Sequence, residues 1–235
     1  MSIIYQMTEK INSVLLIIKR NRRIIKFNKN KPLKLNLGCG LAVEKSWVNI
    51  DGSLNSLFAN FPNFIHKIVF KLSGARDYYS IKEYCNILSK NNFIHHDLSY
   101  NIPFNDGIVD FIFTSHFVEH LFKRDAENFL NESFRVLKNG GKLRISVPDL
   151  NFAVNQYLQG KKKEMLENYF FVDHNDNHFS RHKYMYDFEI LETILEKIGF
   201  VDIIKCDYKK GSLPNLNILD NRPEDSLFIE VMKPF

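Results

Sequence analysis

The chain has 235 residues, of which 45% are hydrophobic and 25% are charged, a composition typical of a globular protein with a full apolar core. Its three cysteines are too few for a disulfide framework or a cysteine-rich zinc site, and no apolar stretch approaches the roughly 18 residues of a membrane span. Because no signal peptide is recognisable either, we expect a globular, cytoplasmic protein rather than a transporter or a small secreted scaffold.

The positive charge is concentrated at the N-terminus. The first 34 residues hold nine Lys and Arg but one acidic residue, so they carry +8 while the whole chain carries +5. The remaining residues are therefore slightly acidic, which does not favour a nucleic-acid-binding surface over the main body. We expect no nucleic acid partner.

Apolar residues recur at helical spacing between residues 3 and 18, and a basic cluster follows from Lys19 to Lys26. This pattern predicts a basic amphipathic helical arm over residues 1–31, ahead of a domain at 32–235. Two roles stay open for the arm. We favour packing on its own domain or on a second subunit of a homodimer; the alternative is peripheral contact of residues 1–30 with the anionic inner face of a membrane.

From Pro32 onward, strand and helix patterns alternate. The predicted strands lie at 33–37, 47–51, 93–98, 109–114, 142–147, 200–208 and 227–232. The clearest helices are predicted at 124–138, stopping at Asn139-Gly140-Gly141, and at 187–198, stopping at Gly199. Residues 52–92 indicate short helices without clear ends. Together these patterns predict an α/β doubly wound sheet with an antiparallel strand at or near its edge.

Three polar signals follow three successive predicted strands. Gly38-Cys39-Gly40 follows the first, Asp51 ends the second, and Asp97 ends the third. A turn without Cβ atoms lets backbone N–H groups approach a ligand, and a carboxylate can accept the hydroxyls of a ribose or the amine of a base. Each signal alone has a simpler explanation as a turn or helix cap. Their coincidence at one edge of a sheet favours a ligand site.

The series LNLGCG, WVNID, HHDLSYNIPFNDGIVDFIFTSHFVEHL, FLNESFRVLKNGGKLRISVPDL and ILEKIGF resembles class I S-adenosylmethionine-dependent methyltransferases. More narrowly, it is similar to small bacterial enzymes associated with surface-polysaccharide synthesis. The resemblance runs from about Lys34 to the C-terminus. It implies a Rossmann-like sheet of seven strands in the order 3-2-1-4-5-7-6, with strand 7 antiparallel.

The resemblance also implies the residues that would bind S-adenosylmethionine (SAM). The turn 37–40 would lie under the methionine part, Asp51 would bind the ribose, and Asp97 with Leu98 would contact the adenine. Ser115 would line the wall near the transferred methyl group. The full implied set is Leu37, Gly38, Cys39, Gly40, Asp51, Asp97, Leu98 and Ser115.

The connection from Gly40 to Asp51 departs from the usual pattern. It spans 11 residues, whereas a dinucleotide fingerprint spaces its glycines and acid by about 20. We therefore expect the first helix to be shortened or lost. Position 43 is Val, so the third glycine of a G-x-G-x-x-G is missing, which counts against NAD.

His116 is our first candidate for the base that takes a proton from a hydroxyl acceptor, because it directly follows the fourth predicted strand. Glu119 follows as a predicted substrate contact, and we favour a structural role for His120. A polar segment from Asp173 to Tyr184 is predicted to form a loop over the site. Its candidates are the catalytic residues His178 and His182 and the substrate-binding residues Arg181 and Tyr184.

His174, His178 and His182 would line one face of a helix and could hold a metal there. The intervening Asn175-Asp176-Asn177 favours a turn instead, so we expect no metal site.

Several absences narrow the function. The segment TSHF stands at the position where methyltransferases that act on nucleobase amines have a pattern similar to Pro-Pro-Tyr. The sequence also contains neither the G-x-S-x-G turn of hydrolases nor a Walker A loop. We therefore favour O-methylation of a sugar hydroxyl in a nucleotide-sugar or surface glycan. Two alternatives stay open: a non-catalytic partner subunit with the same fold, and an NAD-dependent sugar oxidoreductase or epimerase.

Overall fold

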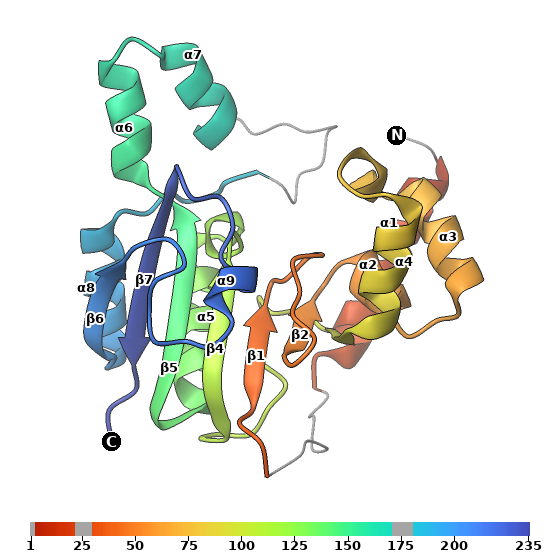
Figure 1. Ribbon diagram of the computed structural model, residues 1–235, viewed down its shortest axis with the longest axis horizontal. Helices are drawn as coiled ribbons and strands as arrows, with labels where there is room; N and C mark the ends of the chain where they lie inside the picture. The colour runs from red at the N-terminus through yellow and green to blue at the C-terminus, as the bar shows by residue number, and fades with distance from the viewer. Residues whose placement is uncertain (1–2, 22–29, 171–180) are drawn as a thin grey trace.

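The computed structural model describes residues 3–21, 30–170 and 181–235, which form one seven-stranded sheet with helices on both faces (Figure 1). The strand order is β3-β2-β1-β4-β5-β7-β6, and β7 is antiparallel to both of its neighbours. This is the order and direction that the resemblance implies. The strands are β1 (Lys34–Leu37), β2 (Val48–Asp51), β3 (Asn92–His95), β4 (Val109–Ser115), β5 (Leu137–Pro148), β6 (Val201–Cys206) and β7 (Ser226–Met232).

The helices fall into three groups along the chain. On the β3 side lie α1 (Ile3–Lys19), α2 (Leu54–Phe58), α3 (Asn63–Leu72), η1 (Gly74–Asp77) and α4 (Ile81–Lys90). In the middle of the chain are η2 (Val118–His120), α5 (Lys123–Val136), α6 (Leu150–Leu158), α7 (Lys162–Met165) and the π-helical turn η3 (Leu166–Phe170). The last group is α8 (Phe188–Ile198) and α9 (Leu216–Leu219). Among the described helices, none is long and apolar enough to cross a membrane.

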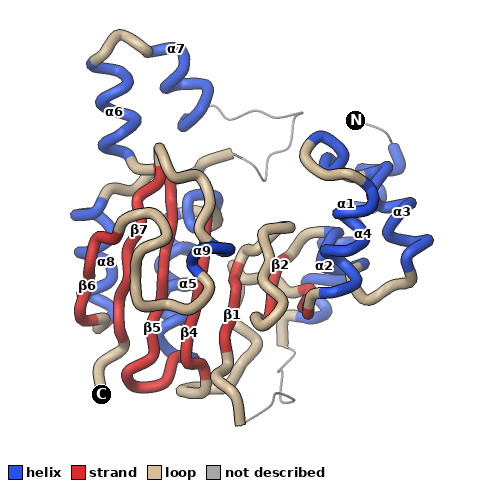
Figure 2. Tube along the Cα trace, in the orientation of Figure 1, coloured by secondary structure: helices blue, strands red, loops and turns tan. Residues whose placement is uncertain are grey.

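The main core lies between the sheet and the helices α5 and α8, which cover one face (Figure 2). Phe129 and Leu130 from α5 and Leu191 and Leu195 from α8 are fully buried there. A smaller cluster around Trp47 and Phe113 packs under α9 on the opposite face. The sheet is therefore covered on both faces, as a parallel sheet with apolar strands requires.

The predicted end of the helix at Asn139-Gly140-Gly141 is wrong. Helix α5 ends at Val136, and the glycines lie inside β5. There the backbone of Gly140 has φ +76°, and its N–H donates to the carbonyl of Lys233 at 2.9 Å. A Cβ on Gly140 would lie 2.8 Å from the ring of Phe235. The glycines serve a bend against the C-terminal segment rather than a helix cap.

The connection between β1 and β2 contains no helix in its ten residues, all of which the structure describes. Two buried asparagines on the neighbouring strands satisfy part of its backbone instead. Asn36 donates to the carbonyl of Ala42 at 2.9 Å and to the amide oxygen of Asn49 at 3.0 Å. Asn49 in turn donates to the carbonyl of Trp47 at 3.2 Å. These bonds allow a parallel crossover that is short for its type.

A buried Arg144 fixes the connection between β6 and β7. Its guanidinium is fully buried and pairs with Asp220 at 2.6 Å and with Glu230 at 3.1 Å. It also donates to the carbonyls of Asp207 and Lys210. The network pins this long connection against the sheet, close to the carboxyl end of β4, because Asn221 accepts a hydrogen bond from Ser115 at 3.1 Å.

Helix α1 packs on the chain's own domain, at the carboxyl ends of β2 and β3. Asn12 is buried and donates to the carbonyl of Gly52 at 2.9 Å. His95, at the end of β3, lies 2.8 Å from the Asn12 amide oxygen through Nε2 and 3.0 Å from the Lys19 ammonium through Nδ1. Since an ammonium can only donate, the Nδ1 of His95 must accept and its Nε2 must carry the proton.

This contact requires a neutral His95. Burial, with the nearby Lys19 charge adding to it, lowers the pKa of His95 from 6.5 to about 4. A histidine whose pKa is lower in the folded chain than in the unfolded chain contributes stability above its unfolded pKa, and this contribution is lost as the pH falls. The relevant window runs from about pH 6.5 down to about pH 4.

We predict that the wild-type chain loses more stability between pH 7 and pH 5 than the His95→Gln variant, because glutamine stays neutral. Urea unfolding of both proteins at the two pH values measures the difference. Hydrogen exchange over residues 10–20 should report the same loss locally. Equal pH dependence in the two proteins would contradict the role given to His95.

Candidate functional site

The turn after β1 contains two glycines with positive φ that differ in their surroundings. Gly38 has φ +67°, and a Cβ there would lie 2.2 Å from the ring of Phe117. Gly40 has φ +51°, and a Cβ there would meet nothing within 4 Å. Gly38 is therefore required by packing, whereas the space beside Gly40 is open to a ligand.

Asp51 closes this turn from the end of β2. Its Oδ2 accepts from the N–H of Gly40 at 2.9 Å, and its Oδ1 accepts from the N–H of Ser53 at 2.7 Å. Each carboxylate oxygen has a second lone pair, so a half-buried Asp51 can still accept from two hydroxyls. Cys39, between the two glycines of the turn, is buried. This burial, together with the nearby charge of Asp51, raises the pKa of its thiol well above the usual range. It is an inert packing residue at this turn.

Asp97 follows β3 at the same edge of the sheet, and its carboxylate is occupied. Its Oδ1 accepts from the N–H of Ser99 at 3.1 Å, which makes it a turn residue. Its Oδ2 lies 3.3 Å from the guanidinium of Arg20, which follows α1. The neighbouring Leu98 is buried. The structure thus places Asp97 against Arg20 of the N-terminal arm, while Leu98 lies in the main core.

Ser115 and His116 stand at the end of β4. Ser115 donates to Asn221, as described above, and His116 has φ +50°, an uncommon backbone conformation for a residue with a side chain. The imidazole is buried between two partners: Nε2 lies 3.0 Å from the hydroxyl of Ser226, and Nδ1 lies 3.3 Å from Oε1 of Glu119. The ring is therefore oriented from both sides.

Glu119 lies at the centre of a group of imidazoles. Its side chain is fully buried in η2, 3.3 Å from His116 and 3.8 Å from Nε2 of His120. Burial alone would raise the pKa of Glu119, but the close rings of His116 and His120 hold it below its ordinary value. The carboxylate is thus ionised in a buried position.

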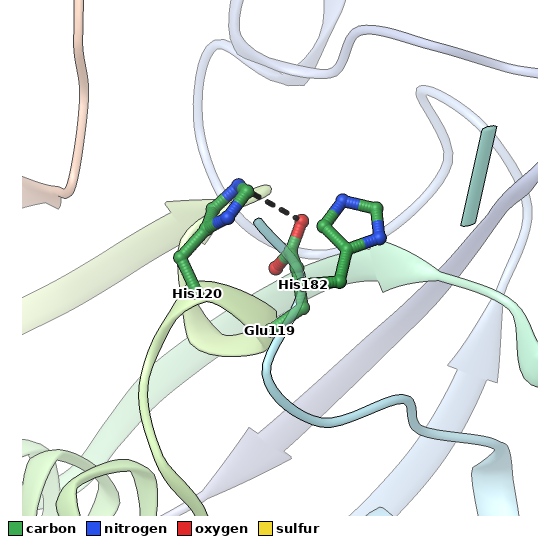
Figure 3. A group of neighbouring side chains, drawn as sticks. All are labelled: Glu119, His120 and His182. Atoms are coloured by element: carbon green, nitrogen blue, oxygen red, sulfur yellow. Dashed lines mark ion pairs between the residues drawn. The ribbon is translucent and has the colours of Figure 1, made fainter. Parts of the chain in front are cut away.

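The segment after residue 180 brings a third imidazole to this group. His182 lies near His120 (Figure 3), with ring centroids 5.1 Å apart. Its Nδ1 is 2.7 Å from the carbonyl of Tyr169. Burial lowers the pKa of His182, which keeps the ring neutral near pH 7. The N–H of Lys183 donates to the carbonyl of Glu119 at 2.7 Å and ties the segment to η2.

Of the other residues predicted on the acceptor side, the structure describes Arg181 and Tyr184. Arg181 is exposed beside His120, and its carbonyl lies 3.2 Å from Nδ1 of that histidine. Tyr184 is half-buried and packs on Tyr186, with ring centroids 5.0 Å apart. His178 lies outside the described residues.

Sequence reasoning missed Arg20, Asn221 and Ser226, which reach the site from distant parts of the chain. No local motif marks them. The sequence does contain one signal of a distant contact: Arg144 is a charged residue inside an apolar strand, so it must have a buried acidic partner, which is Asp220 next to Asn221.

One family model matches part of the chain. Residues 75–145 match the family model described as a methyltransferase domain, a span that includes Asp97, His116 and Glu119 but not the turn after β1. No curated protein matches the chain significantly.

Similar solved structures include two SAM-dependent methyltransferases. One, from Thermotoga maritima and described as a possible histamine N-methyltransferase, is 16% identical with a TM-score of 0.50, over 86% of this chain and 82% of that one. The other, from Archaeoglobus fulgidus, is 17% identical with a TM-score of 0.51, over 96% and 94%. A possible exported protein from Bordetella parapertussis is 12% identical with a TM-score of 0.51, over 97% and 68%. These likenesses show the fold, and the family match shows that residues 75–145 resemble a methyltransferase domain.

Proposed function

We propose that the chain transfers a methyl group from SAM to a hydroxyl of a sugar in a nucleotide-sugar or surface glycan. The main support for SAM as the cofactor is the hydrogen bond between Gly40 and Asp51, because it places an open backbone turn directly beside a carboxylate with free lone pairs. Ligands of open α/β sheets bind at this edge of the strands. SAM supplies a methyl group bound to a positively charged sulfur.

Each part of the cofactor has matching residues at the edge formed by β1, β2 and β3. The turn 37–40 would hold the methionine part and Asp51 the ribose. Leu98 would pack on the adenine, while Asp97 already pairs with Arg20. Because Arg20 and Asn12 connect the arm to this edge, α1 would border the adenosine end of the bound cofactor.

The side that faces the acceptor is rich in groups that bind hydroxyls. His182 lies next to Glu119 and His120, the exposed Arg181 contacts His120 through its backbone carbonyl, and Tyr184 follows in the same segment. Such donors and acceptors suit a sugar better than an apolar or planar substrate. This composition supports a sugar hydroxyl as the acceptor.

His116 is the base in this proposal. The ionised Glu119 faces Nδ1 and favours the tautomer that carries the proton there, so the lone pair on Nε2 faces a hydroxyl, which in the unliganded chain belongs to Ser226. An acceptor hydroxyl that takes the place of Ser226 could give its proton to Nε2.

We predict that His116→Asn lowers the methylation rate by about 100-fold or more, the usual contribution of a positioned base, while SAM affinity changes little. Asparagine tolerates the positive φ of this position better than alanine does. The assay measures transfer of labelled methyl from SAM to a panel of nucleotide-sugars and lipid-linked glycans, with SAM affinity measured by titration calorimetry.

Ser226→Ala is the matched control, because it removes the same hydrogen bond but leaves the imidazole in place. It should keep most of the activity. If His116→Asn loses SAM affinity in parallel with rate, His116 is structural. If the wild type binds SAM but methylates no sugar in the panel, the proposed acceptor class is wrong, and a non-catalytic subunit becomes the better explanation.

We also propose that the arm binds an anionic membrane surface while it stays packed on the domain. The side of α1 that faces away from the domain exposes Ile11, Val14, Ile17 and Ile18, each more than half accessible. The arm also carries more net positive charge than the whole chain, because the remaining residues are slightly acidic. Apolar side chains beside basic residues are the pattern of interfacial helices, and this position would bring the site near a lipid-linked acceptor.

We predict that Ile18→Glu weakens flotation with vesicles of phosphatidylcholine and phosphatidylglycerol. Leu158→Glu on α6 is the control, since Leu158 is 73% exposed and Ile18 is 71% exposed. It should float like the wild type, and vesicles of phosphatidylcholine alone should bind all three proteins weakly. Equal flotation of the two variants would contradict membrane binding through α1.

A further inference from the structure

Glu119, His120 and His182 form a group with the donor atoms of a metal site. One ligating atom from each side chain lies within 4.8 Å of the others (Figure 3). Glu119 and His120 are neighbours in η2, whereas His182 comes from a segment about sixty residues later in the chain. The fold, rather than a local sequence motif, brings them together.

The first sign that a metal ion could bind here is the buried carboxylate of Glu119. Both oxygens of Glu119 are buried, and neither has a hydrogen-bond partner of good geometry in the described part of the chain. A buried carboxylate without full hydrogen bonding is costly, and groups of this kind are paired or coordinate metals. The neighbouring imidazoles at 3.3 and 3.8 Å answer this need only in part.

The second sign is the orientation of the two imidazoles. Nδ1 of His120 lies 3.2 Å from the carbonyl of Arg181, and Nδ1 of His182 lies 2.7 Å from the carbonyl of Tyr169. A carbonyl oxygen only accepts, so Nδ1 must carry the proton in each neutral ring, and the lone pair stays on Nε2. Histidines that bind metals are held in this way, with the second nitrogen donating to a backbone carbonyl or carboxylate.

We propose that Glu119, His120 and His182 bind a divalent transition-metal ion of the zinc class. Two nitrogens and one carboxylate suit Zn²⁺, whereas Mg²⁺ and Ca²⁺ prefer ligand sets made of oxygen. His120 and His182 are both partly exposed, so solvent or an acceptor oxygen could take the remaining position. His116 would donate to the metal-bound carboxylate and hold it in place.

The site would tighten when it binds the ion. Zinc–nitrogen bonds of about 2.0–2.1 Å in a tetrahedral arrangement set ligand atoms about 3.3 Å apart. Oε1 of Glu119 and Nε2 of His120 are 3.8 Å apart, and the three ligand atoms lie within 4.8 Å of one another, so the atoms must approach by roughly 0.5 to 1.5 Å. This site is different from a metal site at His174, His178 and His182, which the sequence analysis did not favour. The two share only His182, and His174 and His178 lie outside the described residues.

The test is titration calorimetry of tag-free, metal-stripped protein with Zn²⁺, in the absence of SAM and acceptor. The result is therefore independent of the proposed methyl transfer. We expect one Zn²⁺ per chain and little binding of Mg²⁺. His120→Ala and His182→Ala should each weaken Zn²⁺ binding at least roughly tenfold, because even residues that only support a ligand are worth that much.

Glu119→Gln should have the same effect if the variant folds, which circular dichroism will check. If Glu119→Gln does not fold, the two histidine variants decide the test, because both histidines are partly exposed and their substitution disturbs the fold less. Co²⁺ should give the intense visible absorption of a four- or five-coordinate site in the wild type and lose it in these variants.

His174→Ala and His178→Ala are the controls and should bind Zn²⁺ like the wild type. The proposal is overturned if the wild type binds no Zn²⁺. It is also overturned if His120→Ala and His182→Ala keep wild-type affinity, or if only the two control variants lose it.

Discussion

The hydrogen bond from the N–H of Gly40 to the carboxylate of Asp51 connects the end of β1 to the end of β2 and defines the shape of the candidate cofactor site. It is possible because the connection between these strands is short and has no helix. The buried pair Asn36 and Asn49 takes over part of the hydrogen bonding of that connection. Replacing Asn49 with an apolar residue would remove its buried hydrogen bond to the carbonyl of Trp47, and a buried group left unpaired costs more than the bond itself contributes.

A second centre lies beyond the end of β4, where the ionised Glu119 faces His116 and His120. A buried carboxylate among imidazoles is an expensive arrangement that packing alone does not require. In the proposed function the two centres have different roles: the glycine turn and Asp51 would face the cofactor, while Glu119 and the imidazoles would face the acceptor. The segment after residue 180 joins the second centre through the bond from Lys183 to the carbonyl of Glu119.

Local patterns predicted much of this arrangement and missed the rest for physical reasons. Alternating strand and helix patterns located all seven strands, and the resemblance supplied their order. Gly38 and Asp51 could be chosen because glycine turns and strand-end carboxylates are local features. The helix end at Gly140 was misplaced because a glycine pair looks the same in a cap and in a bent strand. The pairs Ser226–His116, Arg20–Asp97 and His182–Glu119 depend on tertiary packing, which no spacing along the chain encodes.

The most direct test of the account is titration of the purified chain with SAM, S-adenosylhomocysteine and NAD. We expect micromolar binding of the first two ligands and none of NAD. Asp51→Ala should weaken SAM binding by about 1–3 kcal/mol, the cost of losing hydrogen bonds to a charged group. Absence of binding by either sulfur nucleoside, or binding of NAD instead, would contradict the assignment of the turn after β1 to SAM.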